Sequence, residues 1–376
     1  MKTIIHFIKK EFLQFKRDPK MFGIVLVAPV IQLVFLGYAA KFDVDTVHTA
    51  IFDQDKTETS RNYIDKFKSS GYFEIEEYVS NYDRFEEMIN DGEVMLGIVI
   101  PTDFEKKVNR NQPVKIQALF DGSNGNTAGI AAGYVNAITM DFAQNITTEY
   151  LERMGVKQTM SSSVIPEVRV WYNPEMETRN FMVPGIVGLL LTIVTLMLTS
   201  LAIVKEKEIG TMEQLIVTPI KSYQIILGKL IPFMIMGFLV VLIVLNAMYF
   251  IFGIPVRGSI FFLYFGAFAY ILSTLGLGLF LSTISNTQQQ AMMLAIFLVM
   301  MPMIFFSGFV FPIENMPVVI QAITYLVPLR YFNTILRGII LKGIGIADLW
   351  QEISLLFIIG ITILFLSTKR FNKRLK

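Results

Sequence analysis

The residues that could do chemistry in this sequence are mainly carboxylates and two isolated histidines. Asp53 and Asp55 alternate as carboxylates do in a cation site, but the other positions of a calcium loop are missing, so we expect a solvated turn. Cysteine is absent, which excludes a thiolate nucleophile, and the wide separation of His6 and His48 argues against a histidine-based metal site. No stretch matches the phosphate-binding pattern Gly-x-x-x-x-Gly-Lys-Ser/Thr. We therefore expect no catalytic residue, metal or bound cofactor in this chain.

The composition is that of a membrane protein. Of the 376 residues, 53% are hydrophobic and 17% are charged, whereas soluble globular proteins have about 45–50% and about 25%. Six apolar segments of about 20 residues are long enough to cross a hydrocarbon core about 30 Å thick, and in lipid they must be helices. Lys229 lies one turn inside the third segment, and we expect its amine to reach the interface. The six candidate spans are residues 22–40, 181–204, 225–252, 260–283, 291–311 and 349–367.

The segregation of charge predicts the orientation. With six spans, the N-terminus, residues 205–224, residues 285–290 and the basic tail 369–376 share one side. Counted with Lys229, that side carries a net charge of +10, whereas residues 41–178 carry −10. Lysine and arginine accumulate on the cytoplasmic side, so both termini are expected there. The first span could also be a cleaved signal peptide. Its long charged leader and Pro29 instead favour an uncleaved anchor that comprises residues 21–40.

Residues 41–178 have the composition of a soluble domain. Strand-like stretches at 47–52, 73–79, 94–100 and 114–120 alternate with helix-like stretches at 59–69, 82–89, 103–108 and 127–154, and a last strand is possible at 167–172. This alternation predicts an α/β domain of four or more strands. The predicted fold is a polytopic α-helical membrane protein with six transmembrane helices and an extracytoplasmic α/β domain inserted between helices 1 and 2. Residues 179–376 then hold the other five spans.

Residues 1–20 predict an amphipathic interfacial helix. Ile4, Ile5, Ile8, Phe12 and Phe15 fall on one helical face, and basic residues fill the other. Such a helix lies along the anionic inner leaflet, and a proline ends it before the first span. A basic leader that only sets the orientation is the alternative. The residues assigned to this segment are Lys10, Glu11, Arg17, Asp18 and Pro19.

The loop at residues 205–219 has more features than a plain membrane exit needs. It begins with alternating lysines and glutamates, Gly210 permits a sharp bend, and Thr218-Pro219 ends a short amphipathic turn. Met212, Leu215 and Ile216 lie close enough in helical phase to form a docking knob. The bend, the knob and the stop together predict a contact with another protein.

Residues 312–348 are too apolar for a free loop and too broken by proline and glycine for a straight span. Half-inserted, re-entrant helices fit, because irregular backbone at membrane depth is tolerated only against protein or a wet cavity. Glu314 and Arg330 could form an ion pair in this segment. A solvent-facing pair with no functional role is the alternative.

These features resemble the permease subunits of type-2 ATP-binding-cassette (ABC) exporters. The resemblance covers essentially the whole chain, is strongest after residue 179, and favours the branch with a large extracytoplasmic domain between the first two spans, associated with drug and antibiotic export. Its motifs are Lys10-Glu11-Phe12 with Arg17-Asp18-Pro19, the 205–219 loop, Phe306-Ser307-Gly308-Phe309, residues 312–317, Pro328-Leu329-Arg330-Tyr331 and Arg337-Gly338.

The resemblance implies a bacterial cytoplasmic-membrane complex with no nucleic acid. Two permease subunits, identical or related, would pair with two separate ABC ATPases, which bind the ATP and Mg. The residues it implies for contact with the ATPase are Glu206, Glu208, Gly210, Thr211, Met212, Glu213, Leu215, Thr218 and Pro219. The residues it implies for the outer mouth are Ser307, Gly308, Pro312, Glu314, Pro317, Pro328 and Arg330.

The expected function is ATP-driven export of an apolar or amphiphilic substrate, such as a drug, an antibiotic or a lipid-like compound. Many Phe and Met side chains would suit such a path, although lipid contact and core packing explain them equally well. No acidic, basic or histidine side chain lies in the middle of a span, which argues against proton antiport. A sodium-coupled secondary transporter stays open. So does a non-transporting envelope protein that acts as a receptor or secretion scaffold.

Overall fold

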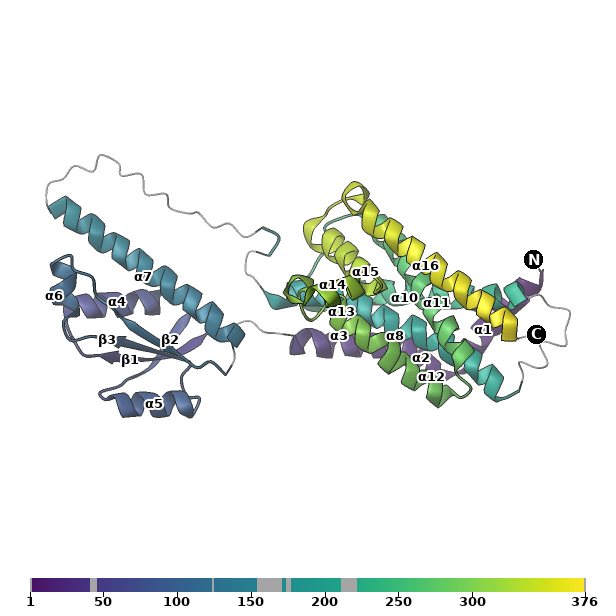
Figure 1. Cartoon of the computed structure of the whole chain (residues 1–376), viewed down its shortest axis with the longest axis horizontal. Helices are drawn as coiled ribbons and strands as arrows, with labels where there is room; N and C mark the ends of the chain where they lie inside the picture. Colours follow the sequence, from purple (N-terminus) through teal and green to yellow (C-terminus); the bar gives the residue numbers. More distant parts are fainter. Residues whose placement is uncertain are drawn as a thin grey trace. The chain divides into compact units, whose positions relative to one another are not determined.

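The computed structural model describes residues 2–40, 46–123, 125–153, 171–173, 177–210 and 222–374. The chain divides into two compact units. The helical unit comprises residues 1–41 and 169–376, and the α/β unit comprises residues 42–168. Figure 1 shows both units along the chain.

The described part of the helical unit consists of helices and their connections (Figure 1). Its elements are α1 (Lys2–Arg17), α2 (Pro19–Phe22), the π-helical turn η1 (Gly23–Val27), α3 (Ala28–Ala39), α8 (Thr178–Glu208), α10 (Ser222–Phe252), α11 (Ile260–Ile284), α12 (Gln288–Leu294), η2 (Ala295–Met300), α13 (Met301–Phe306), η3 (Ile313–Asn315), α14 (Val318–Thr324), α15 (Pro328–Arg337), η4 (Gly338–Lys342) and α16 (Ile346–Arg374).

Within the described residues, five helical stretches are long and apolar enough to cross a membrane. They are Thr178–Glu208, Tyr223–Phe252, Ile260–Ile284, Gln288–Phe306 and Ile346–Phe371. The predicted first span differs, because its apolar helix Gly23–Ala39 is shorter and contains the π-helical turn η1. Mostly helical structure with five membrane-capable helices confirms the predicted class of polytopic α-helical membrane protein. Six spans and the outer location of residues 41–178 stay predictions.

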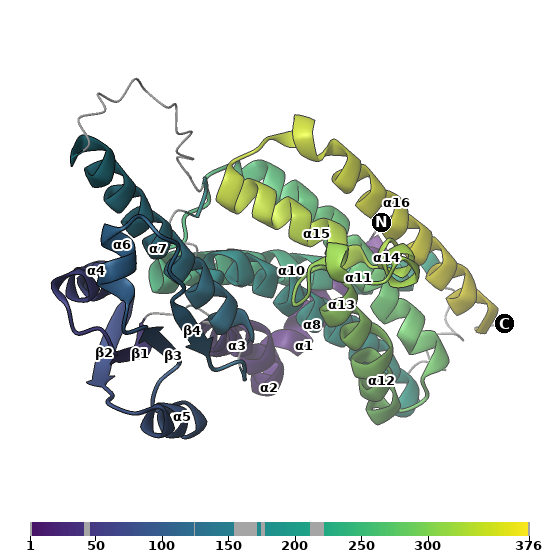
Figure 2. The ribbon, with the colours of Figure 1, turned by 60° about the vertical axis from the view of Figure 1, so that its left-hand side comes forward.

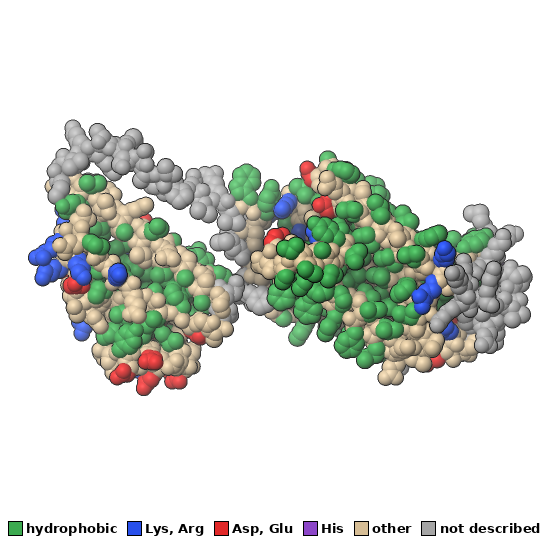
Figure 3. All heavy atoms as spheres, in the orientation of Figure 1, with side chains coloured by type: hydrophobic (Ala, Val, Ile, Leu, Met, Phe, Trp, Pro, Cys, Tyr) green, Lys and Arg blue, Asp and Glu red, His purple; other side chains and the backbone are tan. Residues whose placement is uncertain are grey.

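Hydrophobic side chains cover most of the visible surface of the helical unit over α13, α15 and α16 (Figure 3). On α10 and α11, Phe250 is 78% exposed and Phe261 is 73% exposed. On α14, Val318 is 80% exposed. Monomeric soluble proteins rarely expose so much contiguous apolar surface. A lipid environment explains it.

The core of the helical unit is organised around α8, which is buried along most of its length and packs against α3, α10, α11 and α15. Small residues let the helices approach closely, since a Cβ added at Gly278 of α11 would lie 2.7 Å from Thr199 Cβ. Polar side chains then bond between helices: the Thr195 hydroxyl donates to Thr274 Oγ1 at 2.8 Å, and Thr192 bonds the Tyr270 hydroxyl.

The α/β unit contains a four-stranded sheet of order β2-β1-β3-β4. β1 (Val47–Asp53) pairs in parallel with β2 (Phe73–Tyr78) and β3 (Leu96–Ile100), and β4 (Gln117–Phe120) is antiparallel to β3. The helices of the unit are α4 (Glu58–Ser69), α5 (Tyr82–Asn90), α6 (Phe104–Asn109) and α7 (Gly125–Arg153). The four expected strands and four expected helices are therefore present.

Helices cover both faces of this sheet, with α4 and α7 on one face and α5 on the other (Figures 1 and 2). Two apolar clusters follow from this arrangement, one centred on Tyr63 and Phe67 and the other on Phe85. The helices begin where the sequence supplies caps, since Thr57 and Ser60 form a capping box for α4 and Asn81 caps α5. The strand expected at 167–172 falls almost entirely outside the described residues, and Trp171 and Tyr172 are not in a strand.

Candidate functional site

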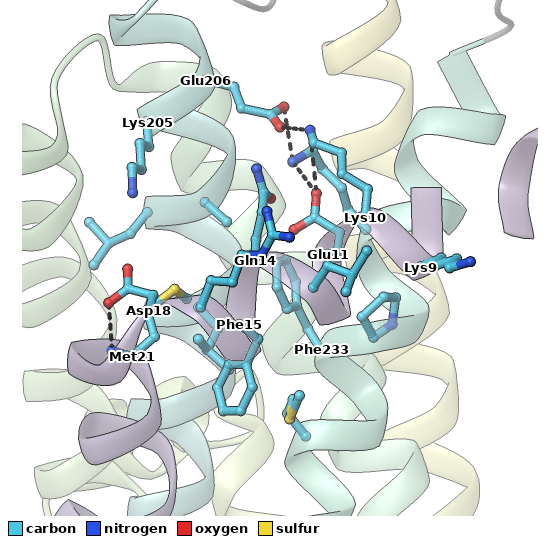
Figure 4. Close-up of a pocket in the computed structure, with 18 of the residues that line it drawn as sticks. Lys9, Lys10, Glu11, Gln14, Phe15, Asp18, Met21, Lys205, Glu206 and Phe233 are labelled. Atoms are coloured by element: carbon cyan, nitrogen blue, oxygen red, sulfur yellow. Dashed lines mark hydrogen bonds and ion pairs between the residues drawn. The ribbon is translucent and has the colours of Figure 1, made fainter. Parts of the chain in front are cut away.

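Four charged side chains from three helices of the helical unit meet, and Figure 4 labels three of them, Lys10, Glu11 and Glu206. Lys10 and Glu11 come from α1, Glu206 from α8 and Lys229 from α10. Lys229 Nζ lies 3.0 Å from Glu11 Oε1 and 2.9 Å from Glu206 Oε2, and Lys10 Nζ lies 2.7 Å from Glu206 Oε1. We call these four residues the ion cluster. Its two amines and two carboxylates balance in charge.

Three members of the ion cluster are buried or nearly so, whereas the Lys10 side chain is 40% exposed. The exposed fraction of the side chain is 2% for Lys229, 6% for Glu11 and 12% for Glu206. The Lys229 amine, expected to reach the interface, is instead surrounded by its two carboxylate partners. Buried charges must be paired, and removing one partner of a buried ion pair costs about 3–5 kcal/mol. The ion cluster therefore fixes α1, α8 and α10 to one another.

The glycine next to Lys229 explains why α1 and α10 come so close. A Cβ added at Gly228 would lie 2.5 Å from Phe7 Cβ, so the glycine before Lys229 allows α1 to lie against α10. The buried face of α1 therefore carries Phe7 and Glu11. Ile5, expected on the apolar face that lies against the inner leaflet, is 60% exposed and does not pack into this contact.

The expected break after the first helix is present. α1 ends at Arg17 and α2 begins at Pro19. Asp18 lies between them, and its Oδ1 accepts a hydrogen bond from the Met21 backbone N–H at 3.2 Å. Asp18 thereby satisfies a free N–H group in the first turn of α2.

The last turn of α8 contacts a different helix through each of three consecutive residues. Glu206 joins α1 and α10 in the ion cluster. Lys207 Nζ donates to the backbone carbonyls of Ser282 and Ser285 at the end of α11, at 3.2 and 2.7 Å. Glu208 Oε2 accepts a 2.7 Å hydrogen bond from Gln288 Nε2 at the start of α12. Because successive helical residues point about 100° apart, the alternating Lys/Glu run reaches neighbours on several sides.

The chain leaves α8 at Gly210, whose φ of +79° is a left-handed conformation that favours glycine. The bend expected at this glycine is therefore present. The remaining residues predicted to contact an ATPase, Thr211, Met212, Glu213, Leu215, Thr218 and Pro219, lie outside the described residues.

At the other end of α8, Arg337 joins three segments. Its Nη1 donates to the Gly308 carbonyl at 2.9 Å, its Nε donates to the Phe181 carbonyl at 3.3 Å, and its guanidinium lies 3.5 Å from the centroid of the Phe181 ring. Asn333, one turn earlier on α15, donates to Ser307 Oγ at 3.4 Å. Ser307 and Gly308 were predicted for the outer mouth. Arg337 was noted only as part of a motif and Asn333 was not noted at all, since their partners lie far away in the sequence.

The segment 312–348 is built from the short helices η3, α14, α15 and η4, and prolines mark their starts: Pro312, Pro317 and Pro328 directly precede or begin three of them. The expected ion pair between Glu314 and Arg330 does not form. Arg330 bonds the Thr324 hydroxyl and lies 3.9 Å from the Tyr325 ring centroid. The helix α14 separates the two charges along the chain, and Arg330 bonds the end of that helix instead.

The carboxylates of the α/β unit serve local structure. Asp53 accepts hydrogen bonds from the backbone N–H groups of Asp55 and Lys56, both at 3.0 Å, and from the Ser60 hydroxyl at 2.7 Å. The expectation of a turn is therefore confirmed. A hydrogen bond from Lys107 keeps the pKa of Asp103 below its ordinary value.

One group of possible metal ligands was missed. His48 Nδ1 lies 2.6 Å from Glu76 Oε1 and 3.9 Å from Glu74 Oε2, and all three side chains are exposed. The parallel register of β1 and β2, which sets His48 opposite Glu74, brings them together. A strand-pairing argument from the sequence could have found this group.

Comparison with known proteins identifies the family. The family model described as "ABC-2 family transporter protein" matches residues 19–369. The probable multidrug ABC transporter permease YbhR of Escherichia coli (strain K12) is 34% identical over 94% of each chain. The probable multidrug ABC transporter permease YbhS of the same strain is 35% identical over 96% of this chain and 95% of its own. The inner membrane transport permease YhhJ, also from this strain, is 24% identical over 99% of this chain and 98% of its own. The chain therefore belongs to the ABC-2 family and is a type-2 ABC transporter permease.

Proposed function

We propose that this permease is the membrane-spanning subunit of an ATP-driven exporter that moves an apolar or amphiphilic compound out of the cytoplasm or the inner leaflet. The names of YbhR and YbhS, probable multidrug permeases, support this class of substrate. In the proposal both termini are cytoplasmic, the α/β unit lies outside, and the complex sits in a bacterial inner membrane.

Two permease subunits, identical or related, pair with two ABC ATPases that hold the ATP and Mg. The sequence supports separate ATPases, because it contains no phosphate-binding loop of the Gly-x-x-x-x-Gly-Lys-Ser/Thr type. Each ATPase contacts the loop 205–219, with Gly210 as its bend and the Met212–Ile216 stretch as its docking knob.

The single observation that carries this proposal is the connection of the last turn of α8. A force applied to the loop after Gly210 acts directly on that turn. Glu206 passes the displacement to α1 and α10, Lys207 passes it to α11, and Glu208 passes it to α12. Buried ion pairs are costly to break, so these helix ends move together. Closure of the ATPases would tilt the helices and change access at the far end, where α15 and the segment 307–317 form the outer mouth.

The test uses the permease together with the ABC ATPase that copurifies with it, reconstituted in vesicles. Gly210→Pro removes the left-handed bend, and Glu213→Lys reverses a charge in the proposed docking loop. Both variants should lower ATP-dependent transport without changing insertion or abundance. Lys369→Gln, an exposed cation on α16, serves as the control and should transport normally. Normal transport by both loop variants, or transport by the permease alone without nucleotide, would contradict the proposal.

A further inference from the structure

A hollow of about 1000 Å³ lies among α1, α8 and α10, beside the ion cluster. Its lining changes from charged to apolar. Figure 4 shows Lys205, Glu206, Lys10 and Glu11 at one level and the rings of Phe15 and Phe233 at another. Leu198, Leu201 and Ala202 of α8 add to the apolar wall. A hollow that is charged at one level and apolar at the other fits an amphiphile.

The charge of the lining is positive. Its cations are Lys9, Lys10, Arg17, Lys205 and Lys229, and its carboxylates are Glu11, Asp18 and Glu206. Lys10 and Lys229 already pair with Glu11 and Glu206 inside the ion cluster. In the part of the chain that the structure describes, Lys9, Arg17 and Lys205 have no carboxylate within ion-pair distance, and all three are exposed. Three cations are therefore left to attract an anion.

We propose that this hollow binds the phosphate-bearing headgroup of an anionic phospholipid, with the acyl chains along the apolar wall. The inference rests on the proposed function, because it takes the α1 end of the helical unit as the cytoplasmic end, where the leaflet is anionic. Arg17 offers a planar fork of donors that matches phosphate oxygens, and Lys205 offers a point charge. The volume lies at the upper end of the range typical of small-molecule sites.

The apolar wall distinguishes this occupant from a free phosphate. Inorganic phosphate would leave Phe15, Phe233 and the α8 side chains in contact with water, whereas acyl chains bury them. A lipid held here also contacts α1, α8 and α10 at once, next to the charges that join them. The bound headgroup thus becomes part of the connection between the helix ends.

The experiment measures lipid binding to the full-length permease in detergent by native mass spectrometry, without ATPase or nucleotide. The probes are phosphatidylglycerol, phosphatidylcholine and inorganic phosphate. The test variant is Arg17→Gln/Lys205→Gln, which leaves the ion cluster unchanged. The matched control is Lys16→Gln/Lys369→Gln, which removes two exposed cations that do not line the hollow. A second variant, Arg17→Lys/Lys205→Arg, keeps both charges.

We expect the wild type to bind phosphatidylglycerol in preference to phosphatidylcholine. Each cation near an anionic lipid contributes about fivefold in affinity, so the test variant should bind phosphatidylglycerol about 25-fold more weakly. The control and the charge-preserving variant should bind like the wild type. Equal binding by the test variant and the control would overturn the inference. Displacement of the lipid by inorganic phosphate at millimolar concentration would also overturn the inference, because the charge of the headgroup alone would then explain the binding.

Failure of this inference and failure of the proposed function give different results. Lipid binding is measured without the ATPase, so the loss of any ATPase partner would leave the lipid result intact. Conversely, a permease that transports with its ATPase but binds both lipids equally would keep the proposed function and remove only the lipid site.

Discussion

Removing the Lys229 amine should be among the most destabilising single changes in the helical unit. The amine is 2% exposed and lies 3.0 Å from Glu11 and 2.9 Å from Glu206. In Lys229→Met, Glu206 keeps its 2.7 Å contact with Lys10, but Glu11 keeps only a 4.0 Å contact with the same lysine. An uncompensated carboxylate at this burial costs about 3–5 kcal/mol.

The cost can be measured as a shift of the thermal unfolding midpoint in detergent. For a unit of this size, 1 kcal/mol corresponds to about 2–4 °C, so Lys229→Met should unfold about 6–20 °C lower than the wild type. Tryptophan fluorescence at a fixed scan rate is suitable, since irreversible unfolding makes the midpoint depend on that rate. Lys9→Met is the matched control on α1. Its side chain is exposed and has no ion pair in the described residues, so its midpoint should change by less than about 2 °C.

A second substitution tests whether the unpaired Glu11 carboxylate causes the loss of stability. Lys229→Met/Glu11→Gln removes the carboxylate that the first change leaves behind, while Lys10 and Glu206 remain paired. The two substitutions should therefore couple by about 1–3 kcal/mol, and the double variant should unfold at a higher temperature than Lys229→Met. A wild-type midpoint for Lys229→Met, or a double variant that is no more stable than the single one, would refute the reasoning.

Three further changes have defined outcomes. Gly278→Leu forces a side chain into the close contact of α11 with α8, and should lower stability by about 1–3 kcal/mol in the same unfolding assay. Arg337→Gln removes the hydrogen bond from the guanidinium to the Gly308 carbonyl, so Phe309 next to it should become more accessible. A cysteine introduced as Phe309→Cys, in a chain without other cysteines, should therefore react several-fold faster with a maleimide when Arg337→Gln is also present. Because the pKa of Asp103 is lowered in the folded chain, its carboxylate stabilises the fold above about pH 4, and this stabilisation is lost as pH falls through the folded pKa. The difference in unfolding midpoint between the wild type and Asp103→Asn should shrink over the same pH range.

Elements of this fold that are periodic along the chain could be predicted from the sequence. A membrane-crossing helix needs about 20 apolar residues in a row, and the described residues contain five helices that are long and apolar enough. The alternation of short apolar runs with amphipathic stretches likewise predicted the strands and helices of the α/β unit. The predicted first span contains an apolar helix, Gly23–Ala39, but its π-helical turn Gly23–Val27 could not be predicted, since such a turn leaves no trace in an apolar run.

Pairing between distant residues could not be predicted. Glu11 and Lys229 are 218 positions apart, and a hydropathy pattern shows that a charge exists without showing its partner. Lys229 was therefore assigned to the interface, although Gly228 beside it hinted at a close helix contact. The opposite error occurred at Glu314 and Arg330, which are close in sequence but have α14 between them along the chain. Proximity in sequence was therefore a poor guide for this pair.

In the proposed mechanism, α8 connects the ion cluster with the contacts of Arg337. One end of α8 holds Glu206 in the ion cluster, and the other end supplies the Phe181 carbonyl and ring that Arg337 contacts. Between them, Thr192 and Thr195 bond α8 to α11. An α-helix is stiff along its axis because its turns are hydrogen-bonded, so a displacement at Glu206 would move α8 as one body up to Pro184. Pro184 has no backbone N–H, so the first turn of α8, which carries Phe181, is less firmly tied to the rest of the helix. Among the described residues, Arg337 contacts the Phe181 and Gly308 carbonyls and the Phe181 ring. In the proposed mechanism these contacts would open or close with the position of α8.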